Sequence, residues 1–461
     1  MARARSTLLP AFGPAAIVVA VVVVGACSSK APTPPIDPIV FGVSLGLSNA
    51  LAEFAKPQQD AIRVAEGYIN AQGGILGRPV KFQIADDKSD TGAVIGGVVD
   101  GFVGQKVPVL VGPLGSGQVE AVWKKTAGAK LTQISPSATS VTFSTLADGM
   151  DQRFFFRTVP PDDIQGRAVA KLALSGPPSG GDAGAGTPCK RMAIVHNSDA
   201  YGRTMAPVIK DSFTKGGGTV ALTVEVPVVE TPDYAPQVEE IAKLSPPAEC
   251  VAFVMYDDVA GAFLVAYRKR QGSTPGSNPL PDFLIGTDGS YTSGLYKNST
   301  TRGGDGSDQI AAAGVYGTNP DTNPEGSTEY VQFRNIYLAR YTLPANKTEP
   351  EPFTANTFDA AILAALAVEA AGTTEDPIRI RDALLDVANP SSGSTPDKLI
   401  RPADLGEGLL AIRAGEHVDY SGASGRVDLN PQTGNVESGY IFWQATKSGF
   451  VTVRRVAASE L

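Results

Sequence analysis

The sequence predicts an α/β fold built from two doubly wound parallel-sheet lobes with a ligand cleft between them. Short apolar segments typical of buried strands alternate with longer segments of helical periodicity. The alternation occurs in two runs, which are separated by a Gly- and Pro-rich stretch at residues 176–188. Parallel sheets bind ligands at the carboxyl ends of their strands, so two lobes would place these ends face to face across a cleft.

The first run covers residues 39–134 and predicts one parallel sheet. Strands are expected at 39–43, 80–85, 107–111 and 131–134, and helices at 57–71, 91–103 and 118–128. Pro57 lies near the start of the first helix, and Gly73 and Gly74 follow its end, which are ordinary helix start and stop signals.

The second run repeats this pattern and predicts a second sheet. Strands are expected at 191–195, 220–226, 251–256 and 283–286, and helices at 204–215, 235–244 and 259–271. A later segment, 358–371, is almost entirely apolar. It is shorter than the roughly 20 residues that a membrane-spanning helix needs, so we expect a buried core helix.

The composition indicates a packed protein without an electrostatic surface for nucleic acid. Of the 461 residues, 43% are hydrophobic and 19% are charged, and the formal net charge is -8 with no block of Lys or Arg. Three cysteines and two histidines, His196 and His417, are too few and too scattered for a familiar zinc pattern. We therefore expect no metal and no cofactor.

The N-terminus predicts export. Arg3 and Arg5 precede an uncharged stretch at 6–26 that ends in Val24-Gly25-Ala26-Cys27, as in a secretory signal peptide of residues 1–26. A transmembrane anchor is the alternative, but Gly13 and Pro14 interrupt the apolar stretch. The last four residues resemble the bacterial lipobox, which implies lipidation at Cys27 and a Pro- and Ser-rich tether over 27–38.

Two hydroxyl-containing turns follow neighbouring strands of the first run. The segment 111–117 joins a strand to a helix and contains Gly112, Gly115 and Ser116. A helix N-terminus with glycines and a hydroxyl can hold a carboxylate or phosphate. A dinucleotide fingerprint fits poorly, because this segment follows the third strand, whereas a plain turn remains open. The next strand ends in the hydroxyl-rich segment 134–140, which extends the same site or merely caps a helix.

From Ile39 to its C-terminus, the chain resembles the leucine/isoleucine/valine-binding family of periplasmic receptors and the ligand-binding domains of metabotropic glutamate receptors. The motifs that carry this resemblance lie, in order, at residues 69–78, 111–114, 134–140, 156–168, 199–202, 285–289 and 425–430. The resemblance implies two lobes joined by three crossovers. Lobe 1 is expected at 39–160 and 289–400, and lobe 2 at 161–288 and 401–461.

The resemblance also implies which residues hold a ligand. Ser116, Ser137, Ala138 and Thr139 match positions that bind the ligand α-carboxylate, and Tyr201 matches a residue of lobe 2 that closes over the ligand. Asp162 and Asp288 match acidic positions that hold the ammonium group. A buried ammonium requires such a partner, although both aspartates could simply cap turns.

The ligand is expected to be an amino acid or a related small polar carboxylate or amide. Branched-chain receptors carry a Glu near the position of Ala260, which Asp257 or Asp258 could replace, so branched-chain specificity is open. The loop at 45–51 is expected to contact the ligand side chain. The family implies an ABC permease and ATPase as partners, with the membrane reached only through the lipid anchor.

Binding is favoured over catalysis, because the sequence shows no nucleophile elbow or P-loop and neither histidine lies in a triad-like motif. A sensor or scaffold of the same fold without a transport role is the alternative.

Cys189 and Cys250 are expected to form a disulfide. Each precedes a strand of the second run, and the first and third strands of such a lobe lie side by side. Neighbouring strands lie about 4.8 Å apart, close to the Cα separation that a disulfide accepts. Two buried free thiols are the alternative.

Overall fold

The computed structural model describes residues 37–146, 153–178, 186–228, 233–273, 280–303, 306–321, 326–343, 347–392 and 397–461. The expected signal peptide and the lipidation site at Cys27 lie outside these ranges.

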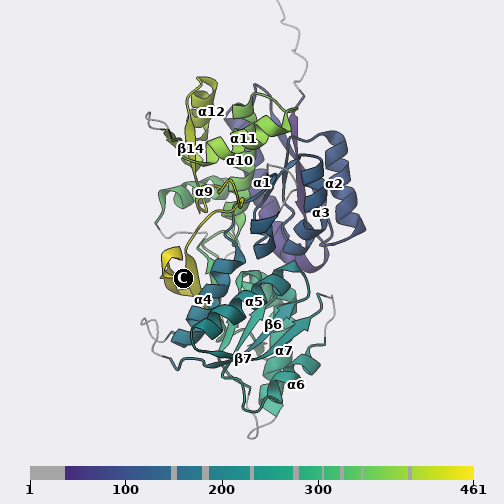
Figure 1. Ribbon diagram of the computed structural model, residues 1–461, viewed down its shortest axis with the longest axis vertical. Coiled ribbons are helices and arrows are strands. Elements are labelled where there is room, and N and C mark those ends of the chain that lie inside the picture. The colour runs from purple at the N-terminus through teal and green to yellow at the C-terminus, as the bar shows by residue number, and fades with distance from the viewer. Residues whose placement is uncertain are drawn as a thin grey trace, which may run out of the picture. The chain divides into compact units, whose positions relative to one another are not determined.

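The first sheet contains five parallel strands in the order β2-β1-β3-β4-β5. The strands are β1 (Ile39–Leu45), β2 (Val80–Asp86), β3 (Val109–Val111), β4 (Thr132–Ser135) and β5 (Phe155–Arg157). The connecting helices are α1 (Ala52–Ala71), α2 (Ala93–Gln105) and α3 (Ser116–Gly128), which lie around this sheet in Figure 1. The elements predicted in the first run are therefore confirmed.

The second sheet contains seven strands in the order β17-β16-β12-β9-β8-β6-β7. They are β6 (Arg191–Asn197), β7 (Thr219–Val226), β8 (Cys250–Val254), β9 (Leu284–Gly286), β12 (Tyr316–Pro320), β16 (Tyr440–Ala445) and β17 (Phe450–Val456). Its helices are α4 (Asp162–Ser175), α5 (Ala200–Lys215), α6 (Ala235–Ala242), α7 (Asp257–Ser273) and α8 (Ser293–Ser299). The sheet is parallel from β7 to β12, and antiparallel β16 and β17 complete one edge.

A third group of elements packs against the first sheet. It comprises α9 (Thr328–Leu338), α10 (Thr354–Ala371), α11 (Pro377–Ala388), α12 (Leu405–Arg413), β13 (Lys398–Ile400), β14 (Val418–Gly422) and β15 (Gly425–Arg426). Two short strands, β10 (Thr300–Arg302) and β11 (Asp308–Ile310), pair with each other.

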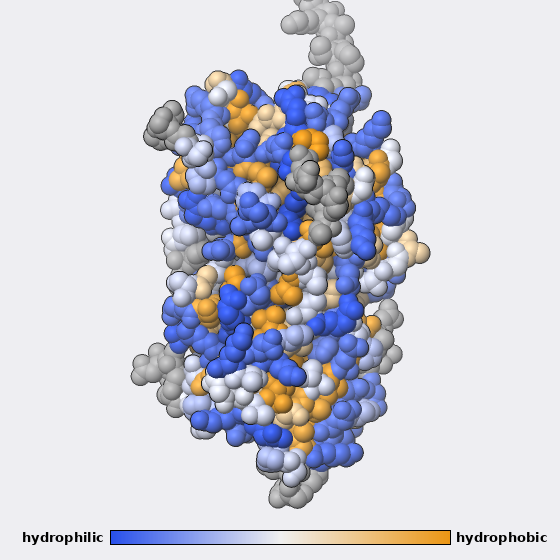
Figure 2. Space-filling model, viewed as in Figure 1, coloured by the Kyte–Doolittle hydropathy of each residue, from blue (hydrophilic) through white to orange (hydrophobic). Residues whose placement is uncertain are grey.

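Helix α10 is the predicted core helix. Among the described residues it alone is long and apolar enough to cross a membrane, but 94% of it is buried inside the protein. It shares one hydrophobic core with α1 and β1. Figure 2 shows hydrophilic residues over most of the visible face, with apolar residues in small scattered groups.

The expected boundaries of the lobes are wrong in the C-terminal half. Residues 289–320 were assigned to lobe 1, but β12 pairs with β9, and Leu295 and Val315 pack in the core around Phe253. Residues 401–436 were assigned to lobe 2, but Leu405 and Val436 lie in the core of the first sheet. The reason is that β9 would otherwise leave an unpaired sheet edge, so the chain adds β12 before it crosses back.

In the structure, lobe 1 therefore combines the first sheet with residues 326–436, and lobe 2 combines the second sheet with its helices. The chain passes between the lobes after β5, after β12 and before β16. These passages agree with the three expected crossovers in number, and the first lies at the expected position, whereas the second and third lie later in the chain than expected.

The structure contains the disulfide between Cys189 and Cys250, with a Cα–Cα distance of 5.9 Å. Strands β6 and β8 are parallel neighbours, with Met192 opposite Cys250. Both cysteines are buried at the amino ends of the strands, which are the ends away from the predicted ligand residues. The expected pairing and its structural reason are thus both present.

Candidate functional site

The seven predicted ligand residues lie on the ends of elements from both lobes, and all are buried, with at most 8% of the residue exposed. Ser116 begins α3, and the segment 137–139 follows β4. Asp162 begins α4 directly after the first crossover, Tyr201 lies in the first turn of α5, and Asp288 follows β9. These positions are carboxyl ends of strands and amino ends of helices, which is where a ligand site is expected in this class of fold.

Hydrogen bonds join these segments. The Asp162 N–H donates to the Thr139 carbonyl at 2.9 Å, which ties α4 to the loop after β4. Ser116 Oγ accepts from the Ser140 N–H at 3.2 Å, which ties the same loop to the start of α3. The sequence prediction that the two hydroxyl-containing turns lie at one sheet edge is confirmed.

Two of the predicted carboxylate-binding residues already use a donor group within the protein. The Ala138 N–H donates to Ser135 Oγ at 3.1 Å, and the Ser137 hydroxyl donates to the Leu114 carbonyl at 3.1 Å. These two hydrogen bonds stabilise the conformation of the loop and have both partners in lobe 1. Ser116 uses its oxygen as an acceptor, which leaves its hydroxyl hydrogen as a donor. Ser116 and Thr139, with the first N–H groups of α3, are the better candidates for contact with an anion.

Asp162 and Asp288 form a buried acidic pair. Both carboxylate oxygens of Asp162 are buried, and neither has a hydrogen-bond partner of normal geometry among the described residues. Burial, followed by the charge of Asp288, raises the pKa of Asp162 well above its ordinary value, although the nearby Thr139 hydroxyl opposes this rise. Burial also raises the pKa of Asp288 to about 6, against hydrogen bonds from Tyr201 and Gly289.

Two buried carboxylates, of which Asp288 raises the pKa of Asp162, are chemically suited to hold a positive charge. A ligand ammonium group would supply the missing hydrogen bonds and offset the cost of burial. In the described part of the chain, no group of three His, Cys, Asp or Glu side chains is placed to hold a metal ion.

Tyr201 contacts the acidic pair through its hydroxyl and a second tyrosine through its ring. Its hydroxyl donates to Asp288 Oδ1 at 2.5 Å and lies 2.7 Å from Thr287 Oγ1. Its ring stacks on Tyr256 with centroids 5.2 Å apart. The hydroxyl of Tyr256 in turn donates to Asp199 Oδ2 at 2.8 Å. Leu51, from the loop at 45–51, packs in the same hydrophobic cluster as both tyrosines.

Sequence reasoning missed the roles of Tyr256, Asp199 and Gln165. Asp199 belongs to a motif that was recognised, and it caps α5 by accepting the Gly202 N–H at 3.3 Å. Gln165 lies one turn after Asp162 on α4 and donates to the Thr318 carbonyl at 3.0 Å. Its place in the recognised motif at 156–168 and its position on the same helix face as Asp162 are the sequence signals that could have indicated it.

Contacts between the lobes surround the site. Ser140 Oγ lies 2.9 Å from Thr204 Oγ1, and Arg203 forms an ion pair with Glu120 at 2.8 Å. Lys297 also pairs with Glu53. These contacts join the amino ends of α3 and α1 to α5 and α8, so both lobes enclose the predicted residues.

The position at which branched-chain receptors carry a Glu does not face this site. Ala260 is buried in the core of lobe 2 with Phe253 and Phe263. Asp257 accepts a hydrogen bond from the Thr292 hydroxyl, and burial raises its pKa to about 7. Asp257 therefore interacts with the segment before α8, and neither Asp162 nor Asp288 contributes to its pKa shift.

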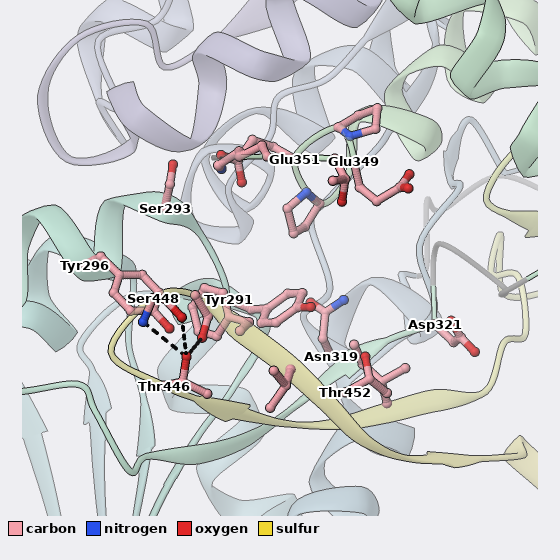
Figure 3. A pocket seen from close by; sticks show the side chains of 18 of the residues that line it. Tyr291, Ser293, Tyr296, Asn319, Asp321, Glu349, Glu351, Thr446, Ser448 and Thr452 are labelled. Atoms are coloured by element: carbon pink, nitrogen blue, oxygen red, sulfur yellow. Dashed lines mark hydrogen bonds and ion pairs between the residues drawn. The ribbon is translucent and has the colours of Figure 1, made fainter. Parts of the chain in front are cut away.

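A separate cavity of about 1270 Å³ lies beside the second crossover. Figure 3 shows Tyr291 and Tyr296 on one side, with Glu349 and Glu351 facing them. The predicted ligand residues do not line it, and its charged groups pair with one another, as Arg334 does with Glu349. We therefore place the site at the buried acidic pair, where both carboxylate oxygens of Asp162 lack a hydrogen-bond partner among the described residues, and not in this cavity.

Comparisons with known proteins agree with this architecture. A family model described as periplasmic binding protein matches residues 38–449. The chain is 26% identical over 418 residues to the chemotactic signal transduction system substrate-binding protein BasB of Halobacterium salinarum, covering 90% of this chain and 89% of that relative. It is 26% identical over 348 residues to a Leu/Ile/Val-binding protein of Rhizobium johnstonii, covering 76% and 83%.

Solved structures share the fold. The leucine-binding protein LivK of Thermotoga maritima superposes with a TM-score of 0.69 at 16% identity, covering 92% of this chain and all of that one. The branched-chain amino acid binding protein LivJ of Streptococcus pneumoniae, solved with isoleucine, gives 0.67 at 20% identity, covering 91% and 99%. A solute-binding protein of Rhodopseudomonas palustris solved with benzoate gives 0.66 at 20% identity, covering 91% and 97%.

Proposed function

Since the chain belongs to the periplasmic binding protein family, we propose that it is a solute-binding protein that closes on an amino acid or a close relative and catalyses no reaction. The observation that carries this proposal is the buried pair of Asp162 and Asp288, together with the hydroxyl of Ser116 and the N–H of Thr139 on the adjoining segments of lobe 1. A zwitterion matches both halves of this arrangement, because its ammonium meets the acids and its carboxylate meets the donors.

The apolar part of the site favours a ligand with some hydrophobic character. Leu51, Tyr201 and Tyr256 pack in one cluster beside the acidic pair. Rings of this kind present large apolar surfaces to a ligand side chain.

The decisive experiment is a thermal-shift screen against amino acids, amides and aromatic carboxylates, followed by calorimetry on the hits. A ligand that binds only the folded state raises the melting temperature, by an amount that grows with its concentration. We expect zwitterionic amino acids to stabilise the protein more than carboxylates of the same size that lack an ammonium group. Equal stabilisation by both classes would contradict the proposed role of the acidic pair.

We also propose that the protein is exported, anchored by lipid at Cys27 and coupled to an ABC permease and ATPase. The basic start, apolar stretch and lipobox-like end at Cys27 support the anchor. Mass spectrometry of the mature N-terminus tests it, with a diacylated or triacylated Cys27 expected and an intact Met1 contradicting it. The transport role rests on the family and on the names of the relatives.

A sensing role is the second candidate, favoured by the alignment with BasB, which spans 90% of this chain. The two roles differ in what deletion of the gene abolishes. Loss of ligand uptake with intact ligand-directed behaviour favours transport, whereas the reverse result favours sensing.

A further inference from the structure

Arg157 is a fully buried cation that contacts the loop after β4, residues 136–141, which we call the ligand loop. It lies at the end of β5, next to the first crossover. Burial lowers its pKa to about 10, with Asp162 and Asp163 opposing the change, so the side chain remains protonated at neutral pH. A buried charge is costly unless hydrogen bonds satisfy it. The hydrogen-bond partners of this guanidinium therefore indicate its structural role.

The guanidinium holds the loop after β4 by its carbonyl groups. Nη1 donates to the Ala138 carbonyl at 3.1 Å and to the Ser140 carbonyl at 2.9 Å. In a trans peptide the C=O and the following N–H point in opposite directions. By holding the Ala138 carbonyl, Arg157 therefore turns the N–H of Thr139 away from itself.

The N–H groups of the residues on either side of Thr139 already donate to side chains of lobe 1. The Ala138 N–H is bound to Ser135 Oγ, and the Ser140 N–H to Ser116 Oγ. The Thr139 carbonyl accepts from Asp162, which fixes the other side of that residue. The backbone orientation at Thr139 is thus set by contacts on both of its peptide groups.

The same guanidinium reaches the third crossover. Its Nε donates to Asn435 Oδ1 at 2.9 Å, and Nη2 donates to Ser144 Oγ at 2.9 Å. Asn435 Nδ2 also donates to Ser144 Oγ at 3.0 Å, and the Arg157 N–H donates to the Gly434 carbonyl at 3.0 Å. One side chain therefore connects the ligand loop to two of the three segments that join the lobes.

We propose that Arg157 is a positioning residue of the ligand site. It orients the Thr139 N–H toward the ligand carboxylate, and it ties the ligand loop to the first and third crossovers, so that capture of the carboxylate and movement of the lobes are coupled. This inference rests on the proposed amino-acid-binding function.

Arg153 provides a matched control. It is also buried, and it donates to the carbonyls of Gln432 and Phe143 at 3.0 and 2.8 Å. It thus supports the same turn before the third crossover and the same segment after the ligand loop, and its hydrogen bonds to described residues go to Gln432, Phe143, Ser144 and Leu146. Substitution of either arginine by lysine removes a planar, multiply donating group and leaves a charge.

The experiment compares Arg157→Lys with Arg153→Lys, first without ligand. We expect amide hydrogen exchange in residues 136–141 to accelerate about tenfold or more in Arg157→Lys, because opening of the loop costs less. Arg153→Lys should leave these amides within about twofold of the parent protein, after correction for any difference in global stability. Unchanged exchange in Arg157→Lys, or equal acceleration in both variants, overturns the proposal.

The second arm measures affinity by calorimetry for an amino acid found in the screen and for its carboxamide. Hydrogen bonds to a charged acceptor are worth more than those to a neutral one, so Arg157→Lys should lose roughly 10- to 100-fold for the acid and several-fold less for the amide. Arg153→Lys should change both by about twofold or less. Equal losses for acid and amide contradict the orientation of the Thr139 N–H toward a carboxylate.

If Arg157→Lys does not fold, Asn435→Ala removes one partner and keeps the guanidinium. It should accelerate the same amides in the same direction by a smaller factor, and no acceleration overturns the coupling to the third crossover. If the parent protein binds no ligand in the screen, the proposed function fails, while the exchange measurement still decides whether Arg157 positions the loop.

Discussion

Replacing Asp288 by Asn tests the acidic pair through two independent properties, the pH dependence of stability and the affinity for ammonium-bearing ligands. The pKa of Asp288 rises from 3.8 to about 6 on folding, mainly because of burial. The folded state therefore binds more protons than the unfolded state between these two values. It follows that the free energy of unfolding of the ligand-free protein falls as pH rises through this window.

The size of the effect follows from the shift. A rise of this size corresponds to about 3 kcal/mol of lost stability at neutral pH, since each pKa unit is about 1.4 kcal/mol. Asp288→Asn removes this titration and also lowers the pKa of Asp162, whose rise depends on the charge of Asp288. We expect the variant's stability to change less than the parent's between pH 4 and pH 7, and to exceed it at neutral pH.

The assay is thermal or chemical unfolding of the ligand-free protein from pH 4 to pH 7, followed by calorimetry with ligand at pH 7. Asp288→Asn should weaken the binding of an amino acid by about 10- to 100-fold, which corresponds to the loss of one charged hydrogen bond. It should weaken the binding of a carboxylate without an ammonium group much less. Identical pH profiles for parent and variant, or equal losses for both ligands, would refute the reasoning.

Asp359 provides the control for this experiment. Burial likewise raises its pKa to about 6, but it lies on α10 and accepts hydrogen bonds from Tyr420, Ala423 and Ser424 within lobe 1. Asp359→Asn should alter stability and its pH dependence without changing the ratio of affinities for the two ligand classes.

Three further predictions follow from the same structure. Ser116→Ala should weaken the binding of carboxylate ligands about 10- to 100-fold by calorimetry with little change in unfolding, whereas Ser137→Ala, whose hydroxyl bonds to Leu114, should act mainly on stability. Cys189→Ala with Cys250→Ala should lower the free energy of unfolding by up to about 4 kcal/mol for a sequence separation of 61, with ligand affinity unchanged, and two reactive thiols in the denatured, unreduced parent would contradict the bond. Glu120→Gln should change affinity less than about threefold, because its ion pair with Arg203 is about half exposed, and a larger loss would show that this pair holds the lobes together.

The sequence predicted the parallel strands and the turns at their carboxyl ends because both signals are local. An apolar run followed by Gly112 and Ser116 can be recognised without knowledge of the fold. Strand β5 and helix α4 were missed, although α4 carries Asp162. The strand has only three residues and presents no pattern of its own. The helix has no side-chain cap, although Asp162 and Asp163 in its first turn are a start signal that could have indicated it.

Features that depend on distant partners could not be predicted. Arg157 belongs to a recognised motif, but its role depends on Asn435, which lies 278 residues away. The lobe boundaries failed for the same reason, because β12 is assigned to a lobe by its pairing with β9 and β16, and not by its composition. The disulfide was predictable because each cysteine adjoins a strand whose order in the sheet is set by the fold class.

Under the proposed function, the distribution of the predicted ligand residues explains why a zwitterion would be suited to close this protein. The donors Ser116 and Thr139 belong to lobe 1, Tyr201 and Asp288 belong to lobe 2, and Asp162 lies where the chain crosses between them. A molecule with a carboxylate at one end and an ammonium at the other makes charged hydrogen bonds to both lobes, whereas a ligand with one charge satisfies one lobe. Each charged bond is worth about 1.5–3 kcal/mol, while an exposed ion pair such as Arg203–Glu120 is worth about 0–1 kcal/mol. The free energy that favours closure therefore comes mainly from the ligand, and the contacts at the rim serve to align the lobes.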